Sequence, residues 1–411
     1  MQIAVMGYGI VGSGVVELFE KHKQSIISKS TQNDLMLKYI LEIRDFPDSP
    51  YYSLFTKDFN KILNDDDIKI VVETMGGLNP AYEYVSACLR AGKHVVSSNK
   101  ELVATYGYEL LKLADENNVN FLFEASVGGG IPIIRPINQC LAANEIDEIA
   151  GILNGTTNFI LTKMFGENMS FDDALKLAQE KGYAEKDSSA DVDGIDSCRK
   201  ICILASLSFG NHIYPGDTHT EGISSIKLED IEYAKSWGGT IKLIGKAKIL
   251  DNGKINIIVS PAFVQNHSQL ANADDVFNAI LVRGDAIGEV VFYGRGAGKL
   301  PTASAVVADI IDCAKHNSGK KSFGWGTPID NYVENHLNVP VSLYVRAQIG
   351  DFLSTLAAIE DVIPGVVILK RKDAESDELA FVTPVEKEGS LREKLSSLPL
   401  NLLSVIRVTD Y

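Results

Sequence analysis

An acidic stretch followed by a lysine at helical spacing is a pattern that can hold a proton donor. Residues 188–200 read SSADVDGIDSCRK, with Asp196 four residues before Lys200. Residues four apart lie on one face of a helix, and Ile201 and Leu204 make that face apolar. A lysine held in apolar surroundings can have a lowered pKa and donate a proton. On spacing alone, an ordinary acid–lysine pair at a solvated helix surface explains the pattern equally well.

Helices on either side of a loop are predicted to position this pair. Residues 171–181 have helical periodicity, and Gly182 ends the helix. We expect a loop over 183–195 and a second helix starting near Asp196, an acceptable cap or first-turn residue. Upstream, residues 151–160 read GILNGTTNFI and set a polar group in an apolar frame. This group is either a simple turn or part of a site.

The N-terminal third has the pattern of a dinucleotide-binding turn. Apolar residues 3–6 are followed by Gly7, Gly9 and Gly12, and then by a helical pattern that begins with Ile10 and Val11. In this pattern the first glycine permits the turn, the second admits the pyrophosphate, and the third packs helix on strand. The N–H groups that open the helix face the phosphates.

Strand and helix patterns then alternate, which predicts a doubly wound parallel sheet. Strands are expected at 35–44, 68–77, 94–103 and 119–132. Ligands bind at the carboxyl ends of such strands, where Thr74, Ser98 and Lys100 lie. After the second strand, Arg44 favours a 2′-phosphate and hence NADP, whereas Asp45 favours NAD. Both residues could also be solvated loop residues.

Composition narrows the classes of partner. The 411 residues carry a formal net charge of -15, which disfavours nucleic acid and anionic membranes. No apolar run approaches the roughly 20 residues of a membrane span. Five scattered cysteines and a start without a charged leader indicate reduced thiols and a cytoplasmic location. The length predicts two or three domains.

Seven motifs, in order along residues 1–312, resemble the homoserine dehydrogenases. They are GYGIVGSGV, SSNKELVA, FEASVGGGIPII, GILNGTTNFI, GYAEKDSSADVDGIDSCRK, EGI at 221–223 and GRGAGKLPTASAVVADI at 294–310. The resemblance implies NAD(P)-dependent interconversion of L-homoserine and L-aspartate 4-semialdehyde, in threonine and methionine biosynthesis. It also implies a small-molecule substrate and a homodimer or higher homo-oligomer. A thiol-dependent semialdehyde dehydrogenase fits poorly, because Cys140 lies in an apolar helix pattern. A nucleotide sensor without catalysis would not need the Asp196–Lys200 pair.

The resemblance also assigns roles to residues. Lys200 matches the catalytic lysine that protonates the carbonyl oxygen, and Glu185 and Asp196 match the acids that bind the substrate. Thr156, in the polar group of residues 151–160, is expected to contact the substrate. The remaining positions expected to contact the cofactor are Lys100, Gly182, Gly296 and Gly298.

A sodium site is implied by the resemblance in the glycine-rich end of the strand expected at 119–132. Its ligands would be Glu124, through the side chain or backbone, and the carbonyls of Val127, Gly129 and Ile131. Oxygen ligands on a glycine turn suit a hard cation.

We expect an α/β protein with three domains. Residues 1–130, completed by 296–315, form a Rossmann-type NAD(P)-binding domain, and 131–295 form an α+β catalytic and dimerisation domain. A linker follows at 316–338. Residues 339–411 are predicted to fold in the order βαββαβ, like an ACT-type ligand-sensing module. Whether this module binds a feedback amino acid or only supports the dimer is left open by the sequence.

Overall fold

The computed structural model describes residues 1–411 except 31, 33, 317–318, 320, 373 and 410–411. The linker expected at 316–338 therefore lies partly outside the described residues. The chain forms two compact units. The first comprises residues 1–145, 202–215 and 294–329, and the second comprises 146–201, 216–293 and 330–411. Each unit is described by itself.

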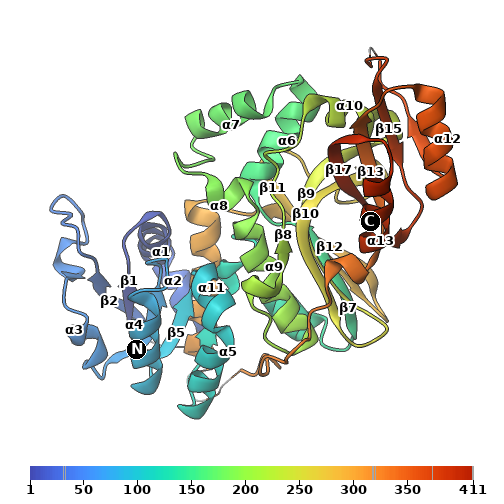
Figure 1. The fold of residues 1–411 in the computed structure, drawn as a ribbon. Helices are drawn as coiled ribbons and strands as arrows, with labels where there is room; N and C mark the ends of the chain where they lie inside the picture. Colours follow the sequence, from blue (N-terminus) through green and yellow to red (C-terminus); the bar gives the residue numbers. More distant parts are fainter. Residues whose placement is uncertain (31, 33, 317–318, 320, 373, 410–411) are drawn as a thin grey trace. The chain divides into compact units, whose positions relative to one another are not determined.

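A six-stranded parallel sheet forms the centre of the first unit, with the strand order β3-β2-β1-β4-β5-β6 (Figure 1). This is the order of doubly wound dinucleotide-binding folds, so the fold prediction for this part is confirmed. The elements are β1 Gln2–Met6, α1 Ile10–Lys21, α2 Lys23–Ser30, β2 Met36–Leu41, β3 Phe55–Thr56, α3 Asn60–Leu63, β4 Ile68–Glu73, α4 Ala81–Arg90, β5 His94–Ser97, α5 Lys100–Glu116, β6 Phe121–Leu122 and α11 Lys299–Lys315.

Several strands are shorter than the sequence predicted. The strand expected at 35–44 ends at Leu41, and the strand expected at 94–103 ends at Ser97. Asn99 explains the second difference, because its side chain accepts a hydrogen bond from the backbone N–H of Leu102 and so begins α5. Apolar residues continue into that helix. Over so short a run, an apolar strand and an apolar helix start have the same sequence pattern.

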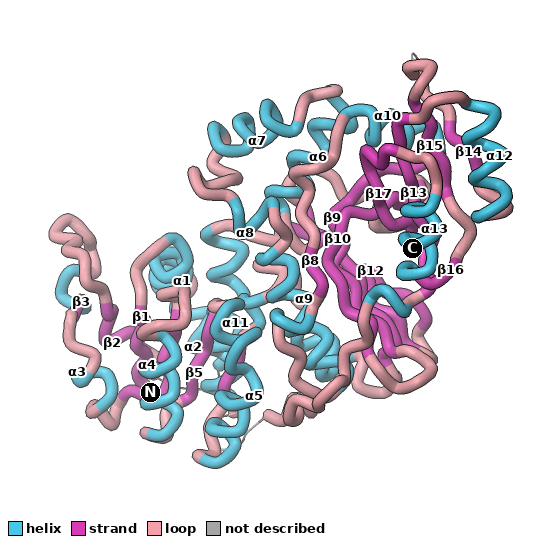
Figure 2. Tube along the Cα trace, in the orientation of Figure 1, coloured by secondary structure: helices cyan, strands magenta, loops and turns pink. Residues whose placement is uncertain are grey.

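An eleven-stranded sheet dominates the second unit, with the main order β12-β11-β7-β9-β10-β17-β13-β15-β14. Figure 2 labels β9, β10, β12 and β13 to β17 of this sheet. Strands β9 and β10 are its longest, and they pair antiparallel along their whole length. The elements up to residue 295 are β7 Ile146–Ile152, α6 Gly155–Glu167, α7 Phe171–Glu180, α8 Ser189–Val192, α9 Ile195–Phe209, β8 His219–Thr220, α10 Leu228–Trp237, β9 Gly239–Ile249, β10 Ile255–Gln265, β11 Phe277–Gly284 and β12 Gly288–Arg295.

The C-terminal residues form the module that the sequence predicted in the order βαββαβ, with one short extra strand. Its elements are β13 Pro340–Gln348, α12 Phe352–Val362, β14 Val367–Leu369, β15 Glu378–Val382, β16 Glu386–Lys387, α13 Glu388–Ser397 and β17 Asn401–Thr409. Leu343, Val345 and Phe381 pack on one face of its sheet against Ile359 and Leu391 of the two helices. Successive strand residues alternate between faces, so Tyr344 and Arg346 lie on the opposite face.

That opposite face is bound to helix α10 by buried polar contacts. Arg346 donates from Nε to Asp230 of α10 at 2.9 Å, and the Tyr344 hydroxyl donates to the same carboxylate at 3.0 Å. In addition, β17 pairs in parallel with β10. The strands of the module therefore continue the sheet that contains β9 and β10.

Two general expectations can be compared with the structure. None of the five cysteines forms a disulfide, and only Cys140 is exposed. Among the residues that the structure describes, no helix is both long and apolar enough to cross a membrane.

Candidate active site

The glycine loop of the first unit is shaped by close backbone contacts. Gly7 has a φ of 96°, and a Cβ there would lie 2.8 Å from the carbonyl oxygen of Thr74. At Gly12 a Cβ would lie 2.0 Å from the carbonyl oxygen of Gly7. A Cβ at Gly9, by contrast, would meet nothing within 4 Å. The loop therefore excludes side chains at its base and is open at Gly9, as a pyrophosphate site requires.

The start of α1 adds hydrogen-bond donors to this loop. Gly9 is the N-cap residue and provides no side-chain cap, and Ile10 and Val11 follow as the first helical residues. The first N–H groups of a helix have no partner within the helix. They can bind phosphate oxygens, aided by the helix dipole.

An acid that sequence reasoning missed, Glu42, follows β2 directly. Its carboxylate accepts the backbone N–H of Tyr8 at 2.9 Å, so it touches the glycine loop. Arg44 donates to both of its oxygens, from Nε at 3.1 Å and from Nη2 at 2.9 Å. These bonds to Arg44 lower the pKa of Glu42 to about 2, against the opposing effect of burial. The strand was predicted to end at residue 44, whereas β2 ends at Leu41. The acid expected after this strand was therefore placed too late in the sequence.

Arg44 and Asp45 differ in their surroundings. The Arg44 side chain is 61% exposed although it is paired with Glu42, and its guanidinium lies 5.4 Å from the ring centre of Phe46. Asp45 is paired with Lys57 at 2.8 Å. Of the two residues, Arg44 alone contacts an acid that touches the glycine loop.

Residues at the ends of β4 and β5 make hydrogen bonds beside the glycine loop. The Thr74 hydroxyl donates to the carbonyls of Met6 and Gly7 at 3.1 and 3.0 Å. Thr74 therefore holds the start of the glycine loop in place. Glu73, which is fully buried, accepts the N–H of Met75 at 2.8 Å and the Ser97 hydroxyl at 2.6 Å. Burial raises the pKa of Glu73.

Ser98 and Lys100 lie at the carboxyl end of β5, as predicted. Between them, Asn99 caps α5 and donates to the carbonyl of Gly77 at 2.6 Å. Lys100 is the first residue of the helix and is partly exposed. Its position at the end of a parallel strand is one where ligands bind.

The late glycine turn joins the first unit by close packing. Gly298, with a φ of 124°, is the N-cap of α11. The carbonyl oxygen of Gly296 would lie 2.5 Å from a Cβ at Gly129. Lys299, which follows the turn, pairs with Glu17 of α1 at 2.7 Å. Both predicted glycines thus lie where α11 packs against the nucleotide-binding sheet.

In the second unit, Asp196 and Lys200 form a buried ion pair. Their side chains are only 4% and 9% exposed, and Lys200 Nζ donates to Asp196 Oδ2 at 2.6 Å. Lys200 also donates to the carbonyl oxygen of Leu153 at 2.7 Å. The solvated surface pair that spacing alone allowed is therefore excluded. A buried ion pair needs such additional hydrogen bonds to offset the loss of water.

Asn154 connects this pair to Asp191, another acid of the 188–200 stretch, and no role was assigned to Asn154 or Asp191 from the sequence alone. Its Nδ2 donates to Asp196 Oδ2 at 2.9 Å and to Asp191 Oδ1 at 2.7 Å. Its Oδ1 accepts the N–H of Thr157 and caps α6. The polar group in residues 151–160 is therefore a helix start built against the acidic loop. The amide could have been found only as a helix-cap pattern, since the residues it joins are 37 and 42 positions away.

Thr156 and Gly182 are near members of this cluster in the sequence, but their contacts are with other residues. The Thr156 hydroxyl donates to the carbonyl of Tyr183 at 2.6 Å. Gly182 has a φ of 73° and ends the helix α7, as predicted. Glu185 is exposed. The loop expected at 183–195 contains the short helix α8, which carries Asp191.

The segment after β6 is held by the Glu124 carboxylate. This buried group accepts the N–H groups of Ile133, Ile134 and Arg135 at 2.7 to 2.9 Å. Between these ends, Gly128 and Gly129 have φ angles of 71° and 55°. The turn's hydrogen bonds end on the carbonyls of Gly128 and Arg295, and not on those of Val127, Gly129 or Ile131.

The predicted site residues lie in separate groups of contacting residues, two in the first unit and one in the second. In the first unit, the glycine loop, Arg44 and Thr74 lie together around Gly7, and the Glu124 segment contacts the late glycine turn. In the second unit, Asp196 and Lys200 form one buried cluster with Asn154 and Asp191. Thr156 and Glu185 do not touch that cluster through the hydrogen bonds of their side chains. Among the described residues, no group of three or more His, Cys, Asp or Glu side chains could hold a metal ion.

A parallel sheet with a glycine loop is typical of dinucleotide-binding proteins such as the NAD(P)-dependent oxidoreductases. Family models support this and give the family. Residues 7–124 match "Homoserine dehydrogenase, NAD binding domain", and residues 132–311 match "Homoserine dehydrogenase". The chain belongs to the homoserine dehydrogenase family.

Individual relatives match all or most of the chain. Homoserine dehydrogenase of Bacillus subtilis is 38% identical over 425 residues, covering 99% of this chain and 96% of that protein. A solved homoserine dehydrogenase from Thiobacillus denitrificans has a TM-score of 0.91 and 33% identity, covering 100% of this chain and 98% of the other. A hyperthermophilic archaeal homoserine dehydrogenase, solved in complex with NADPH, has a TM-score of 0.64 and 29% identity, covering 76% and 97%. These comparisons confirm the predicted family and the use of a nicotinamide cofactor.

Proposed function

We propose that Lys200 is the proton donor of the homoserine dehydrogenase reaction in this chain, and that Asp196 binds the substrate beside it. The observation that carries this proposal is the buried hydrogen bond of 2.6 Å between the two side chains. When bound, the nicotinamide supplies the hydride for reduction of L-aspartate 4-semialdehyde. Lys200 then gives a proton to the carbonyl oxygen, and in the reverse direction it takes the hydroxyl proton of L-homoserine.

Two neighbouring groups fix the position of the Lys200 ammonium. Lys200 Nζ donates both to the carbonyl of Leu153 and to the carboxylate of Asp196, so the ammonium is held beside the acid proposed to bind the substrate. Asp196, with Asp191 and Glu185, supplies negative charge for the substrate ammonium.

Turnover of L-homoserine is the test of this function. With NAD or NADP at alkaline pH, the protein should form the reduced cofactor, followed by its absorbance. Asp196→Ala should raise KM as well as lower kcat, because it removes a contact present in the ground state. A variant with unchanged KM would show that Asp196 does not bind the substrate.

We propose that Arg44 contacts the 2′-phosphate of NADP and that NADP and NAD are both accepted. Support comes from its exposed guanidinium next to Glu42. Arg pairs well with phosphate in a bidentate way, whereas Glu42 is the group type that binds a ribose hydroxyl in NAD-binding folds. The remaining cofactor contacts are the predicted set of Gly7, Gly9 and Gly12 with the α1 start, and Thr74, Ser98, Lys100, Gly182, Gly296 and Gly298.

We further propose that the glycine turn binds a sodium ion through the carbonyls of Val127, Gly129 and Ile131. The Glu124 carboxylate is engaged by three N–H groups, so Glu124 would contribute its backbone carbonyl. The ion would hold the turn in place and take no part in the chemistry. Replacing sodium chloride by choline chloride at equal ionic strength should lower the melting temperature; an unchanged melting temperature would count against the site.

Assembly and location complete the proposal. The family resemblance implies a homodimer or higher homo-oligomer, which sedimentation velocity can measure. The free cysteines support a reducing, cytoplasmic location.

A further inference from the structure

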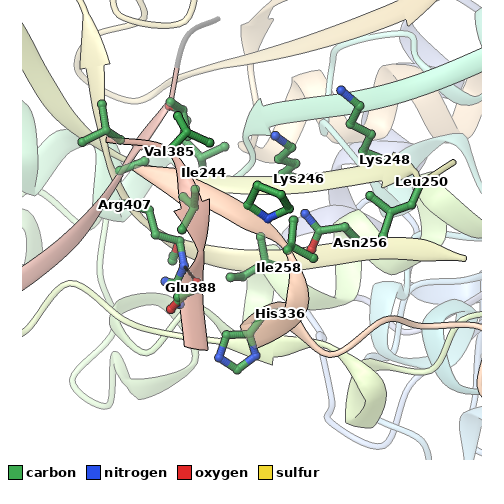
Figure 3. A pocket seen from close by; sticks show the side chains of 17 residues that line it. Ile244, Lys246, Lys248, Leu250, Asn256, Ile258, His336, Val385, Glu388 and Arg407 are labelled. Carbon is green, nitrogen blue, oxygen red and sulfur yellow. Dashed lines mark hydrogen bonds and ion pairs between the residues drawn. The ribbon is translucent and has the colours of Figure 1, made fainter. Parts of the chain in front are cut away.

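Glu73 of the first unit differs from the other buried acids in its surroundings. Among the residues that the structure describes, the buried acids are Glu42, Glu73, Glu124, Glu148, Asp196, Asp230, Asp309 and Glu388. Each of these described acids except Glu73 forms an ion pair with a lysine or arginine. Figure 3 shows such a pair in the second unit, Glu388 with Arg407. Taking a charge out of water is costly unless it is paired, so the charge of Glu73 needs a reason.

The hydrogen bonds of Glu73 are those of an ionised carboxylate. Its Oε1 accepts the N–H groups of Met75 and Gly76 at 2.8 and 3.2 Å, and its Oε2 accepts the Ser97 hydroxyl at 2.6 Å. Ser97 is fully buried, and a proton on Glu73 would compete with the hydroxyl proton of Ser97 for the same bond. Burial raises the pKa of Glu73, and these donors oppose that effect. A cation bound nearby would lower the pKa again.

Holding the turn after β4 does not require a charge. Asn99, a neutral side chain, donates to the carbonyl of Gly77 in this turn at 2.6 Å. It also accepts the N–H of Leu102 at 3.1 Å, and so joins the turn to the start of α5. The carboxamide oxygen of a glutamine at position 73 could accept the N–H groups of the turn in the same way. The negative charge of Glu73 is therefore not explained by the fold of the turn.

The position of Glu73 in the sheet indicates which part of a bound dinucleotide is nearest to it. Doubly wound sheets consist of two halves, and each half binds one mononucleotide. The glycine loop follows β1 and Glu42 follows β2, so the half with β1 to β3 takes the adenosine part. Glu73 is the last residue of β4, in the other half. The turn after it is exposed at Gly76 and Gly77, where an added Cβ would meet nothing within 4 Å. A ligand therefore has access to the turn that the Glu73 carboxylate holds.

We propose that Glu73 supplies the counter-charge for the oxidised nicotinamide ring, and so shifts the affinity of the site from NAD(P)H towards NAD(P)⁺. The oxidised ring is positively charged and the reduced ring is neutral, so a fixed anion distinguishes the two forms. When aspartate 4-semialdehyde is reduced, the ring becomes cationic as the hydride leaves with its electron pair. The anion stabilises charge where it develops. This role of Glu73 rests on the proposed nucleotide site and is independent of the role of Lys200.

Dissociation constants for the two oxidation states, measured on the full chain without substrate, test this role. NADPH is titrated by its fluorescence, and NADP⁺ by displacement of NADPH. Glu73→Gln keeps the size of the side chain and an acceptor for the turn, but removes the charge. The dissociation constant for NADP⁺ divided by that for NADPH should therefore rise about tenfold. Glu73→Asp keeps the charge and should keep the wild-type ratio, even where both affinities fall. NAD⁺ and NADH should show the same pattern.

Glu42→Gln is the matched control, because Glu42 is a buried acid at the end of β2 that is paired with Arg44. It lies in the adenosine half, which is identical in the two oxidation states. Both dissociation constants should therefore change by the same factor. A ratio that Glu73→Gln leaves at the wild-type value, or that Glu42→Gln changes as much, would overturn the role of Glu73 and leave the proposed function untouched. A wild-type protein that binds neither form would contradict the nucleotide site itself.

Ser97→Ala provides a second variant in case thermal unfolding shows that Glu73→Gln does not fold. It leaves the Glu73 carboxyl in place but removes a hydroxyl that stabilises its charge, so a larger fraction of the carboxyl is protonated. The ratio should rise in the same direction by a smaller factor. An unchanged ratio in a folded Ser97→Ala protein would count against the counter-charge.

Discussion

The glycine loop and the buried cluster of Asn154, Asp196 and Lys200 are built in opposite ways. At Gly7 and Gly12 the loop needs the absence of side chains, because any Cβ would collide with backbone. The cluster needs particular side chains, since Asn154 and Lys200 both donate to the buried carboxylate of Asp196. We therefore expect an added side-chain atom at Gly7 or Gly12 to damage the loop, and a removed side chain to damage the cluster. Substitutions in the loop and in the cluster test this difference separately.

Apart from the loss of Lys200 itself, removing the Asn154 amide should have the largest effect. Asn154→Ala removes the donor that Asp191 and Asp196 share, so the two acids are held less firmly in place. Misplacing a reacting group by an ångström can cost about a hundredfold in rate. We therefore expect kcat to fall by about tenfold to a hundredfold, with cofactor affinity unchanged. Steady-state kinetics with saturating cofactor measures this, and Asn154→Asp should restore less than half of the loss because it adds a third acid.

Adding a methyl group to the loop should separate folding from cofactor binding. Gly12→Ala forces the backbone apart at Gly7, and overpacking of this kind costs about 1–3 kcal/mol. Gly9→Ala meets no atom within 4 Å, so its melting temperature should equal that of the wild type while cofactor affinity falls about tenfold. Thermal unfolding and fluorescence titration with NADPH measure the two quantities. Equal losses of stability in both variants would contradict the assignment of Gly9 to the phosphate.

A smaller and selective effect is expected at Arg44. Arg44→Ala should weaken NADP by about 1–3 kcal/mol, the range for a hydrogen bond to a charged group. NAD should change little, because it lacks the 2′-phosphate. The ratio of kcat/KM for the two cofactors is the readout, and a parallel loss with both would remove Arg44 from the phosphate site.

The smallest effect concerns the attachment of the C-terminal module. Burial opposes ionisation of Glu221, but Arg407 overrides it and holds the pKa of this acid at about 2, down from 4.5. A depressed folded pKa adds stability above the unfolded pKa, and that stability is lost as the pH falls from 4.5 towards 2. The urea midpoint of the wild type should therefore exceed that of Glu221→Gln near neutral pH. The difference should narrow below pH 4.5, and a constant difference would contradict the role of this pair.

Features fixed by a local sequence motif could be predicted from the sequence. Gly7, Gly9 and Gly12 were predictable because a local motif fixes their spacing and the backbone conformation follows from it. The i, i+4 spacing of Asp196 and Lys200 was equally local, but their burial was not, since it depends on strands and helices packed from elsewhere in the chain.

Contacts across long separations escaped the sequence. Asn154 and Asp191 meet only after α6 and α8 have packed, and a single sequence carries no signal of that pairing. Glu42 was missed for a different reason, because the end of a strand depends on its neighbours and the predicted end lay three residues too late. The C-terminal order βαββαβ was predictable from alternating patterns, but the continuity of β17 with β10 was not.

The kcat of Lys200→Ala is the measurement that tests the central claim most directly. A general acid contributes about 10²–10⁴-fold, so kcat for L-homoserine oxidation should fall by that factor. Dissociation constants for the cofactors should stay at the wild-type value, because the nucleotide contacts lie on other elements. A variant that folds normally and keeps most of its kcat would show that the proton comes from another group, and would contradict the role assigned to this lysine.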